Sequence, residues 1–163
     1  MRMITNKKMR AILQLIENAN IEELSGVNQI ELDRLLNLPM KRVKDCLIFS
    51  EKTKEELENS FETVIKKRFG DKTGYEACLT ETRINSFFEH EISIETALRI
   101  ALLVIPAWKK KINDIFPDAQ VCFIIGSDGS NVDIRFHLIR KNELPWLSAD
   151  IERYREAVGY IQY

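Results

Sequence analysis

The sequence has few of the residues that build metal, redox and disulfide sites. It contains three cysteines and two histidines in 163 residues. Cys46, Cys78 and Cys122 lie far apart and form no Cys-x-x-Cys pair, which argues against a zinc site, a redox motif and a disulfide framework. We expect buried, reduced thiols, no bound metal and no other cofactor.

The chain also lacks an excess of charge and a long apolar run. Its 24 basic and 25 acidic residues leave a net charge of -1, so no overall field attracts a polyanion. No apolar run is long enough to cross a bilayer, and residues 1–8 contain no apolar signal-peptide core. We therefore expect a cytoplasmic protein with no membrane partner and no specific nucleic-acid partner.

The length and composition predict one folded domain. A chain of 163 residues that is 45% hydrophobic is sufficient for a single core. We predict an α+β fold with a mostly helical part over 1–117, followed by a β-hairpin and a C-terminal element over 118–163. The polar break at 70–74 is the one candidate for a minor boundary, and it is too short for a linker.

Helical spacing of apolar residues occurs repeatedly in the first part of the chain. Pro106 lies within the longest of these segments, where a kink or a break is expected. A polar loop is expected at 71–74, after Gly70. The predicted helices cover 6–24, 30–36, 39–48, 51–69, 84–88 and 93–115.

Strand periodicity is clear only in residues 121–140. Apolar and polar residues alternate over 132–138, so one face of this arm should be buried and the other wet. The first arm, 121–125, is apolar on both faces, which favours an inner or doubly covered strand. Residues 126–131 should form the exposed turn, with Asp128 and Gly129 at its tip.

The end of the chain leaves two structures open. Ser148 fits the start of a last helix, whereas residues 158–163 are rich in strand formers and also fit a third strand. The apolar face of the helix predicted at 93–115 and the apolar face of the hairpin are the two large apolar surfaces, and we expect each to be buried against the other. The core is therefore expected to include Leu98, Leu102, Ile105, Phe123, Ile125, Ile134 and Phe136.

Residues 29–47 resemble a helix-turn-helix DNA-binding unit. Leu32 and Val43 fall where that motif packs its two helices together, and Asn37 fits its left-handed turn position. Asp33 departs from the pattern, which has a small residue there. A structural helix pair is the alternative, and we favour it. The resemblance implies that DNA would be contacted by basic side chains of the second helix, namely Lys41, Arg42 and Lys44.

Neither histidine has the sequence neighbours of a catalytic or metal site. His90 lies between two glutamates, but no second histidine follows at helical spacing, so a solvated helix end is the simpler interpretation. His137 alternates with Asp133 and Arg135 along the second hairpin arm, where ion pairs across strands are expected. No nucleophile or phosphate-binding glycine loop accompanies them. We expect no enzymatic activity and no catalytic residues.

Two tryptophans differ in their expected roles. Trp108 lies at helical spacing and should be in the core. Trp146 follows a proline in a loop, where it is either a cover over the sheet or an exposed binding anchor.

The C-terminal part resembles small bacterial toxin-immunity proteins in its general features. The likeness rests on size, composition and element order, with Arg135-Phe-His137 on a strand, Trp146-Leu147 in a loop and 150–154 opening a helix. It implies a non-enzymatic protein that occludes a toxin. The oligomeric state stays open, and a homodimer is one alternative.

The polar side of the hairpin is the expected partner-binding surface. Successive odd residues of a strand project on one side about 7 Å apart, which suits several separate contacts. A merely solvated face with weak ion pairs is the alternative. The candidate partner-binding residues are Asp128, Asp133, Arg135, His137 and Trp146.

Overall fold

The computed structural model describes residues 2–17, 24 and 26–163 and has an α+β fold. A five-stranded antiparallel sheet has the order β1-β7-β5-β6-β4, and a second sheet pairs β2 with β3. The strands are β1 (Ile4–Thr5), β2 (Met40–Val43), β3 (Cys46–Phe49), β4 (Thr82–Arg83), β5 (Val121–Ser127), β6 (Val132–Leu138) and β7 (Ala157–Gln162). The helices are α1 (Lys7–Glu17), α2 (Gln29–Leu36), α3 (Lys54–Val64), α4 (Lys72–Leu79), α5 (Ile84–Phe87) and α6 (Ile94–Ile115), with a π-helical turn η2 (Ile65–Phe69) and a 3-10 turn η3 (Ile151–Arg153).

The predicted hairpin is present as β5 and β6, with Phe123 opposite Phe136. Strand β7 pairs with the other side of β5, so the C-terminal element is a third strand. The turn is shorter than predicted. Gly126 and Ser127 still belong to β5 and are buried, and Gly129 adopts a left-handed φ of 92° in the exposed turn that follows.

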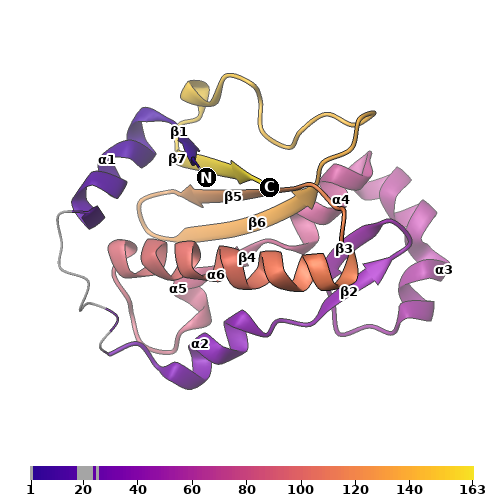
Figure 1. Ribbon diagram of the computed structural model, residues 1–163, viewed down its shortest axis with the longest axis horizontal. Coiled ribbons are helices and arrows are strands. Elements are labelled where there is room, and N and C mark those ends of the chain that lie inside the picture. Colours follow the sequence, from indigo (N-terminus) through magenta and orange to yellow (C-terminus); the bar gives the residue numbers. More distant parts are fainter. Residues whose placement is uncertain (1, 18–23, 25) are drawn as a thin grey trace.

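Helix α6 lies along one face of the large sheet (Figure 1). Ser93 caps it by accepting a hydrogen bond from Thr96 N, and the helix continues through the exposed Pro106 without a break. Trp108 is fully buried and donates its indole N–H to the Leu35 carbonyl at 3.2 Å. Six of the seven predicted core residues are buried, and Leu102 is partly buried.

The predicted third helix is wrong, because residues 40–49 form the β2–β3 hairpin. One face of this hairpin contributes Val43, Cys46 and Ile48 to a second core with α3 and α4, while Leu47 on the other face enters the main core. The two faces are therefore buried against different partners. Strands β2 and β3 lie beside α3 and α4 at one end of the molecule (Figure 1), and the helix-turn-helix interpretation does not describe this segment.

Several other predicted boundaries are corrected. Helix α1 ends at Glu17, and the predicted continuation over 18–23 lies outside the described residues. Helix α3 begins after Thr53, which forms a capping box with Glu56, rather than after Ser50. The predicted loop at 71–74 instead begins α4, because the Asp71 side chain accepts a hydrogen bond from Gly74 N. The predicted last helix is only the turn η3.

Truncation of Phe136 tests the main core. Phe136 is fully buried, with ring centroids of Phe49 and Phe123 at 5.6 and 5.7 Å. We expect Phe136→Ala to lower the free energy of unfolding by about 3–5 kcal/mol, because it removes an aromatic side chain from a closed site. Urea denaturation measures this loss. The control is Ile30→Ala, which removes an apolar side chain that is 76% exposed and should change the free energy of unfolding by about 0.5 kcal/mol or less. Equal losses would contradict the packing.

Candidate functional site

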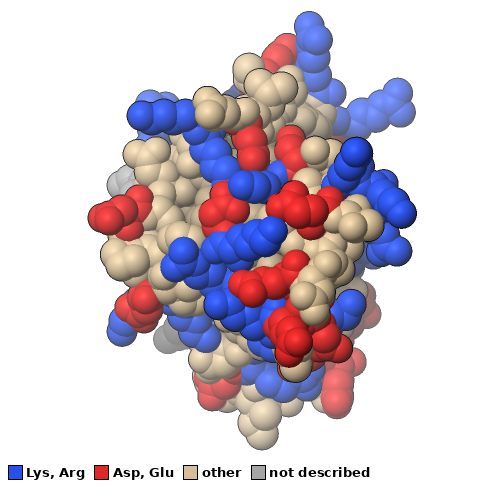
Figure 2. Space-filling model, turned by 90° about the vertical axis from the view of Figure 1, so that its right-hand side faces the viewer, with Lys and Arg blue, Asp and Glu red and all other residues tan. Residues whose placement is uncertain are grey.

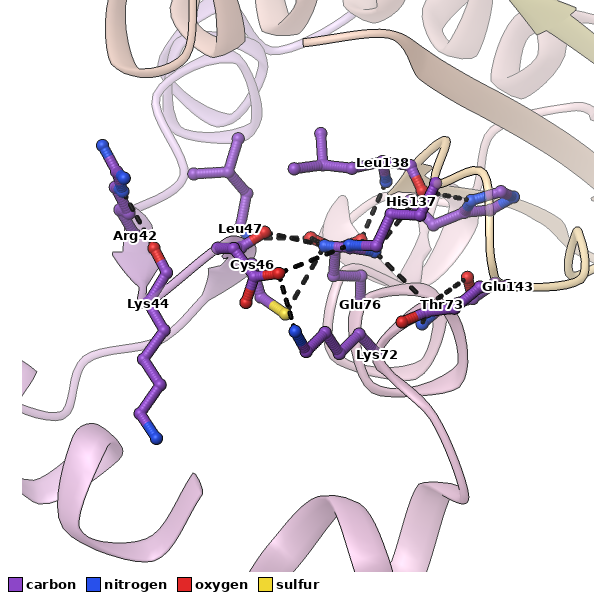
Figure 3. Close-up of polar contacts among 12 residues, drawn as sticks. Arg42, Lys44, Cys46, Leu47, Lys72, Thr73, Glu76, His137, Leu138 and Glu143 are labelled. Atoms are coloured by element: carbon purple, nitrogen blue, oxygen red, sulfur yellow. Dashed lines mark hydrogen bonds and ion pairs between the residues drawn. The ribbon is translucent and has the colours of Figure 1, made fainter. Parts of the chain in front are cut away.

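The most deeply buried charged side chain of the described residues is Glu76 on α4. Its carboxylate accepts hydrogen bonds from Leu47 N and Leu138 N, each at 2.8 Å. The guanidinium of Arg140 donates to both carboxylate oxygens at 2.9 Å, so that the ion pair is bidentate (Figure 3). A single side chain thereby joins α4 to β3, to β6 and to the segment after β6.

Arg140 also contacts the turn of the small hairpin. It donates to the Asp45 carbonyl at 2.8 Å, and the Asp45 carboxylate in turn pairs with Lys72 at 2.7 Å. Glu143 lies 3.6 Å from Arg140 and accepts hydrogen bonds from the backbone and hydroxyl of Thr73 at 2.8 Å. These contacts give the network a structural role, since its donors and acceptors are occupied by the chain itself.

Opposing effects act on the protonation of this network. Burial raises the pKa of the Glu76 carboxyl group, while Arg140 and the two backbone amides lower it. Cys46 Sγ lies 3.5 Å from Arg140 Nη2, and burial raises the pKa of this thiol above its ordinary value. Burial likewise raises the pKa of Cys122 to about 12. Both groups stay thiols at neutral pH, which argues against a nucleophilic role.

Three of the predicted partner-binding residues meet on the outer side of β6. Arg135 Nη2 lies 3.0 Å from Asp133 Oδ2 and 3.3 Å from Glu81 Oε1. The Arg135 guanidinium also lies over the Trp146 ring, 5.9 Å from its centroid. Trp146 remains 39% exposed, so it combines a contact with the sheet and an exposed edge.

The turn residue Asp128 is exposed, as predicted. Its carboxylate accepts hydrogen bonds from Asn131 N and Ser130 N, both at 2.8 Å, and these bonds lower its pKa. Asp128 therefore stabilises its own turn and remains accessible beside the strand end.

The prediction that His137 is exposed is wrong, because its side chain is only 2% exposed. The strand register does place it on the same side as Asp133 and Arg135. That side of the sheet, however, is covered near His137 by the segment that follows β6, which contributes Leu147 and Ile151 to a third apolar cluster. Alternation in the sequence identifies the face but not what covers it.

The basic residues of the former helix-turn-helix interpretation are engaged within the chain. Lys41 Nζ donates to the Lys52 carbonyl, the Arg42 guanidinium lies 4.0 Å from the Phe116 ring centroid, and Lys44 pairs with a glutamate of α3 at 2.9 Å. Figure 2 shows basic and acidic side chains interspersed over this end of the molecule. That mixture does not form the continuous positive surface on which phosphate binding depends.

The remaining predictions concern metals, thiols and membranes. Among the described residues, no group of three or more His, Cys, Asp and Glu side chains is arranged to hold a metal ion. The three cysteines are free, and Cys78 is less buried than the other two. His90 is exposed, as expected for a solvated position. No helix in the described part of the chain is long and apolar enough to span a membrane.

Replacement of Glu76 tests the buried network. Glu76→Gln keeps the side-chain shape but removes the charge that balances Arg140 and turns an amide NH2 toward a backbone donor. We expect the free energy of unfolding to fall by about 3–5 kcal/mol, as when one partner of a buried pair is removed. The exposed Lys54–Glu58 pair at 3.6 Å supplies the control, and Glu58→Gln should cost at most about 0.5 kcal/mol in the same urea titration. Equal costs would show that the buried pair is not needed.

His137 should make stability depend on pH. Burial lowers its pKa below the ordinary value of 6.5, so between the two values the unfolded chain binds a proton that the folded chain does not. Stability should therefore fall as pH drops below about 6.5, by up to about 1.4 kcal/mol per pH unit. Urea titrations from about pH 7.5 to about pH 5.5 measure the slope. His137→Phe should reduce it and the exposed His90→Phe should not; an unchanged slope in His137→Phe would contradict the assignment.

Comparison with known proteins identifies a family but no curated or structural relative. No curated protein matches the chain, and no solved structure matches it either. Residues 4–163 match the model of the Uncharacterized protein PM0498 family. Since the match spans nearly the whole chain, this protein belongs to the PM0498 family.

Proposed function

We propose that this protein is a non-enzymatic binding protein that recognises another protein through the partner face, defined as Asp133, Arg135, Leu144 and Trp146. The observation that carries this proposal is the pairing of a half-exposed Trp146 with Arg135. Tryptophan and arginine are the residues most enriched among binding hot spots. Leu144, two residues before Trp146, is 81% exposed and adds apolar surface to the same loop.

The partner face is held in place before any partner arrives. Arg135 is only 15% exposed and is fixed between the Asp133 and Glu81 carboxylates. Holding a long side chain in one conformation lowers the entropic cost of using it in an interface. The rigid β6 strand thus presents Arg135 and Asp133, while the loop presents Trp146.

The mixed charge favours a protein partner over a nucleic acid. Glu81 and Asp133 flank Arg135, and Arg83 lies 4.0 Å from Glu81, so positive and negative groups alternate. A phosphate backbone would meet repulsion from the two carboxylates. A protein surface that carries both signs is complementary to such a pattern.

The specific form that we propose is a bacterial immunity-type protein, which neutralises a toxin by occlusion. The support is the resemblance of the C-terminal part in size, composition and the placement of Arg135 on a strand and Trp146 in a loop, without the predicted helix at 150–154, together with a surface of charged and aromatic groups that needs no turnover. A solvated face with weak ion pairs is the competing interpretation, and mutation distinguishes the two.

The product of the gene adjacent to this one in the source genome is the partner to test. We expect coexpression to suppress the growth defect that this product causes alone, and the purified proteins to bind. Arg135→Ala and Trp146→Ala should each weaken binding in a calorimetric titration by more than about 1 kcal/mol, because they remove hot-spot side chains.

The control is Lys54→Ala on α3, whose side chain is exposed and lies outside the partner face. It should leave the affinity unchanged, and all variants should remain folded under the conditions of the titration. Absence of binding, or binding that is insensitive to both Arg135→Ala and Trp146→Ala, would reject the proposal. A catalysed change in the partner would reject the non-enzymatic assignment.

A further inference from the structure

His137 has a buried ring nitrogen without a partner. Its Nδ1 lies 3.1 Å from the Leu138 carbonyl oxygen, which only accepts hydrogen bonds, so Nδ1 carries the proton. The lone pair is then on Nε2, and none of the described residues donates a hydrogen bond to it. Figure 3 shows the His137 ring pointing away from Glu76. An unsatisfied buried acceptor destabilises the folded state, which calls for an explanation.

Two small cavities, of about 190 and 150 Å³, lie beside the ring. His137, Pro145 and Gln162 line both of them. Their floor is the sheet face opposite α6, where Cys122 is directly across from His137 and Gln162 directly across from Cys122. The larger cavity is mostly apolar and is completed by Leu147, Ser148, Ala149 and Tyr160.

The cavities lie under the covering loop, defined as residues 141–150, and are partly open to solvent. This loop has no helix or strand. It is fixed at Glu143, which binds Thr73, and at Ser148, whose N–H donates to the Tyr154 hydroxyl at 2.9 Å. Between these points Leu144 is 81% exposed and also lines the rim of the smaller cavity. Because His137 Nε2 is fully buried, a ligand in the cavities reaches it only after a shift of this middle part of the loop, which takes no part in the strand pairing beneath.

We propose that the space under the covering loop binds a small neutral molecule, mostly apolar, with one O–H or N–H group that donates to His137 Nε2. The nearby charges of Arg140 and Glu143 are already engaged with each other and with Glu76 and Thr73, so they do not select a charged ligand. An apolar cavity of about 150 Å³ is large enough for benzene, so a ring with one hydroxyl fits the larger cavity. This site touches the partner face at Leu144, but the proposal does not depend on the proposed function.

Phenol and anisole form a matched pair of probes, because anisole has the ring and the oxygen but no donor. In a titration of the full chain followed by NMR, we expect phenol to bind in the range of about millimolar Kd. It should bind about tenfold more tightly than anisole, the ratio that one net hydrogen bond of about 1.4 kcal/mol provides. The ¹⁵N resonance of His137 Nε2 should move with phenol and not with anisole.

Two variants and one control separate the contributions. Cys122→Leu fills the floor of the larger cavity and should weaken both probes equally, whereas His137→Phe should abolish the preference for phenol. The exposed His90→Phe should change neither affinity. If His137→Phe fails to fold, the Nε2 resonance in the unmodified chain decides. Equal binding of phenol and anisole, an unmoved Nε2 signal, or no saturable binding up to about 10 mM would each overturn the proposal.

Discussion

The outer edge of β6 is the constraint on which much of this structure depends. Strand β4 pairs with only two of its residues, at Ile134 and Asp133. The rest of the edge is completed by side chains. Thr80 Oγ1 donates to the Phe136 carbonyl and accepts from its N–H, Asn85 Oδ1 accepts from Val132 N, and Glu76 accepts from Leu138 N. Residues 76–85 therefore replace a full edge strand and leave no open ladder for another chain to join.

Glu76 is buried where it completes this edge, so its negative charge must be balanced. The groups that balance it connect further parts of the fold. Arg140 supplies the opposite charge from the same strand end, and Leu47 N uses the remaining acceptor capacity of Glu76. Glu76 therefore completes the edge of the large sheet and also fixes the small β2–β3 sheet to it. An apolar pair of similar size would avoid the desolvation cost but would leave two backbone amides unpaired.

The sequence predicted the parts whose burial follows from local periodicity, and it failed where burial is decided by distant segments. Helix α6 and the β5–β6 hairpin each carry a long periodic set of apolar residues, and each set packs against the other element. Val43, Cys46 and Leu47 have helical spacing, yet they lie on a hairpin between two cores, so both strand faces are apolar and alternation is lost.

The residues around the Glu76 network differ in how far the sequence could have identified them. Asp71, which caps α4, was a usable signal for the start of that helix. Nothing local distinguishes Glu76, whose partner lies 64 residues away, from the other acidic residues. The sequence placed His137 on the correct side of its strand, but the covering loop, which begins at Lys141, lies over that side.

The covering loop connects the two proposals physically. Its exposed residues Leu144 and Trp146 belong to the partner face, while Pro145 and Leu147 line the cavity beneath. If a ligand under the loop shifts these residues, it changes the affinity for the partner, and linkage requires the partner to change the affinity for the ligand by the same factor. A ligand that leaves the loop in place would have no such effect, since only differential binding to two positions moves an equilibrium. The position of Trp146 relative to Arg135 is therefore the quantity that would report coupling, because their contact spans the loop and the strand.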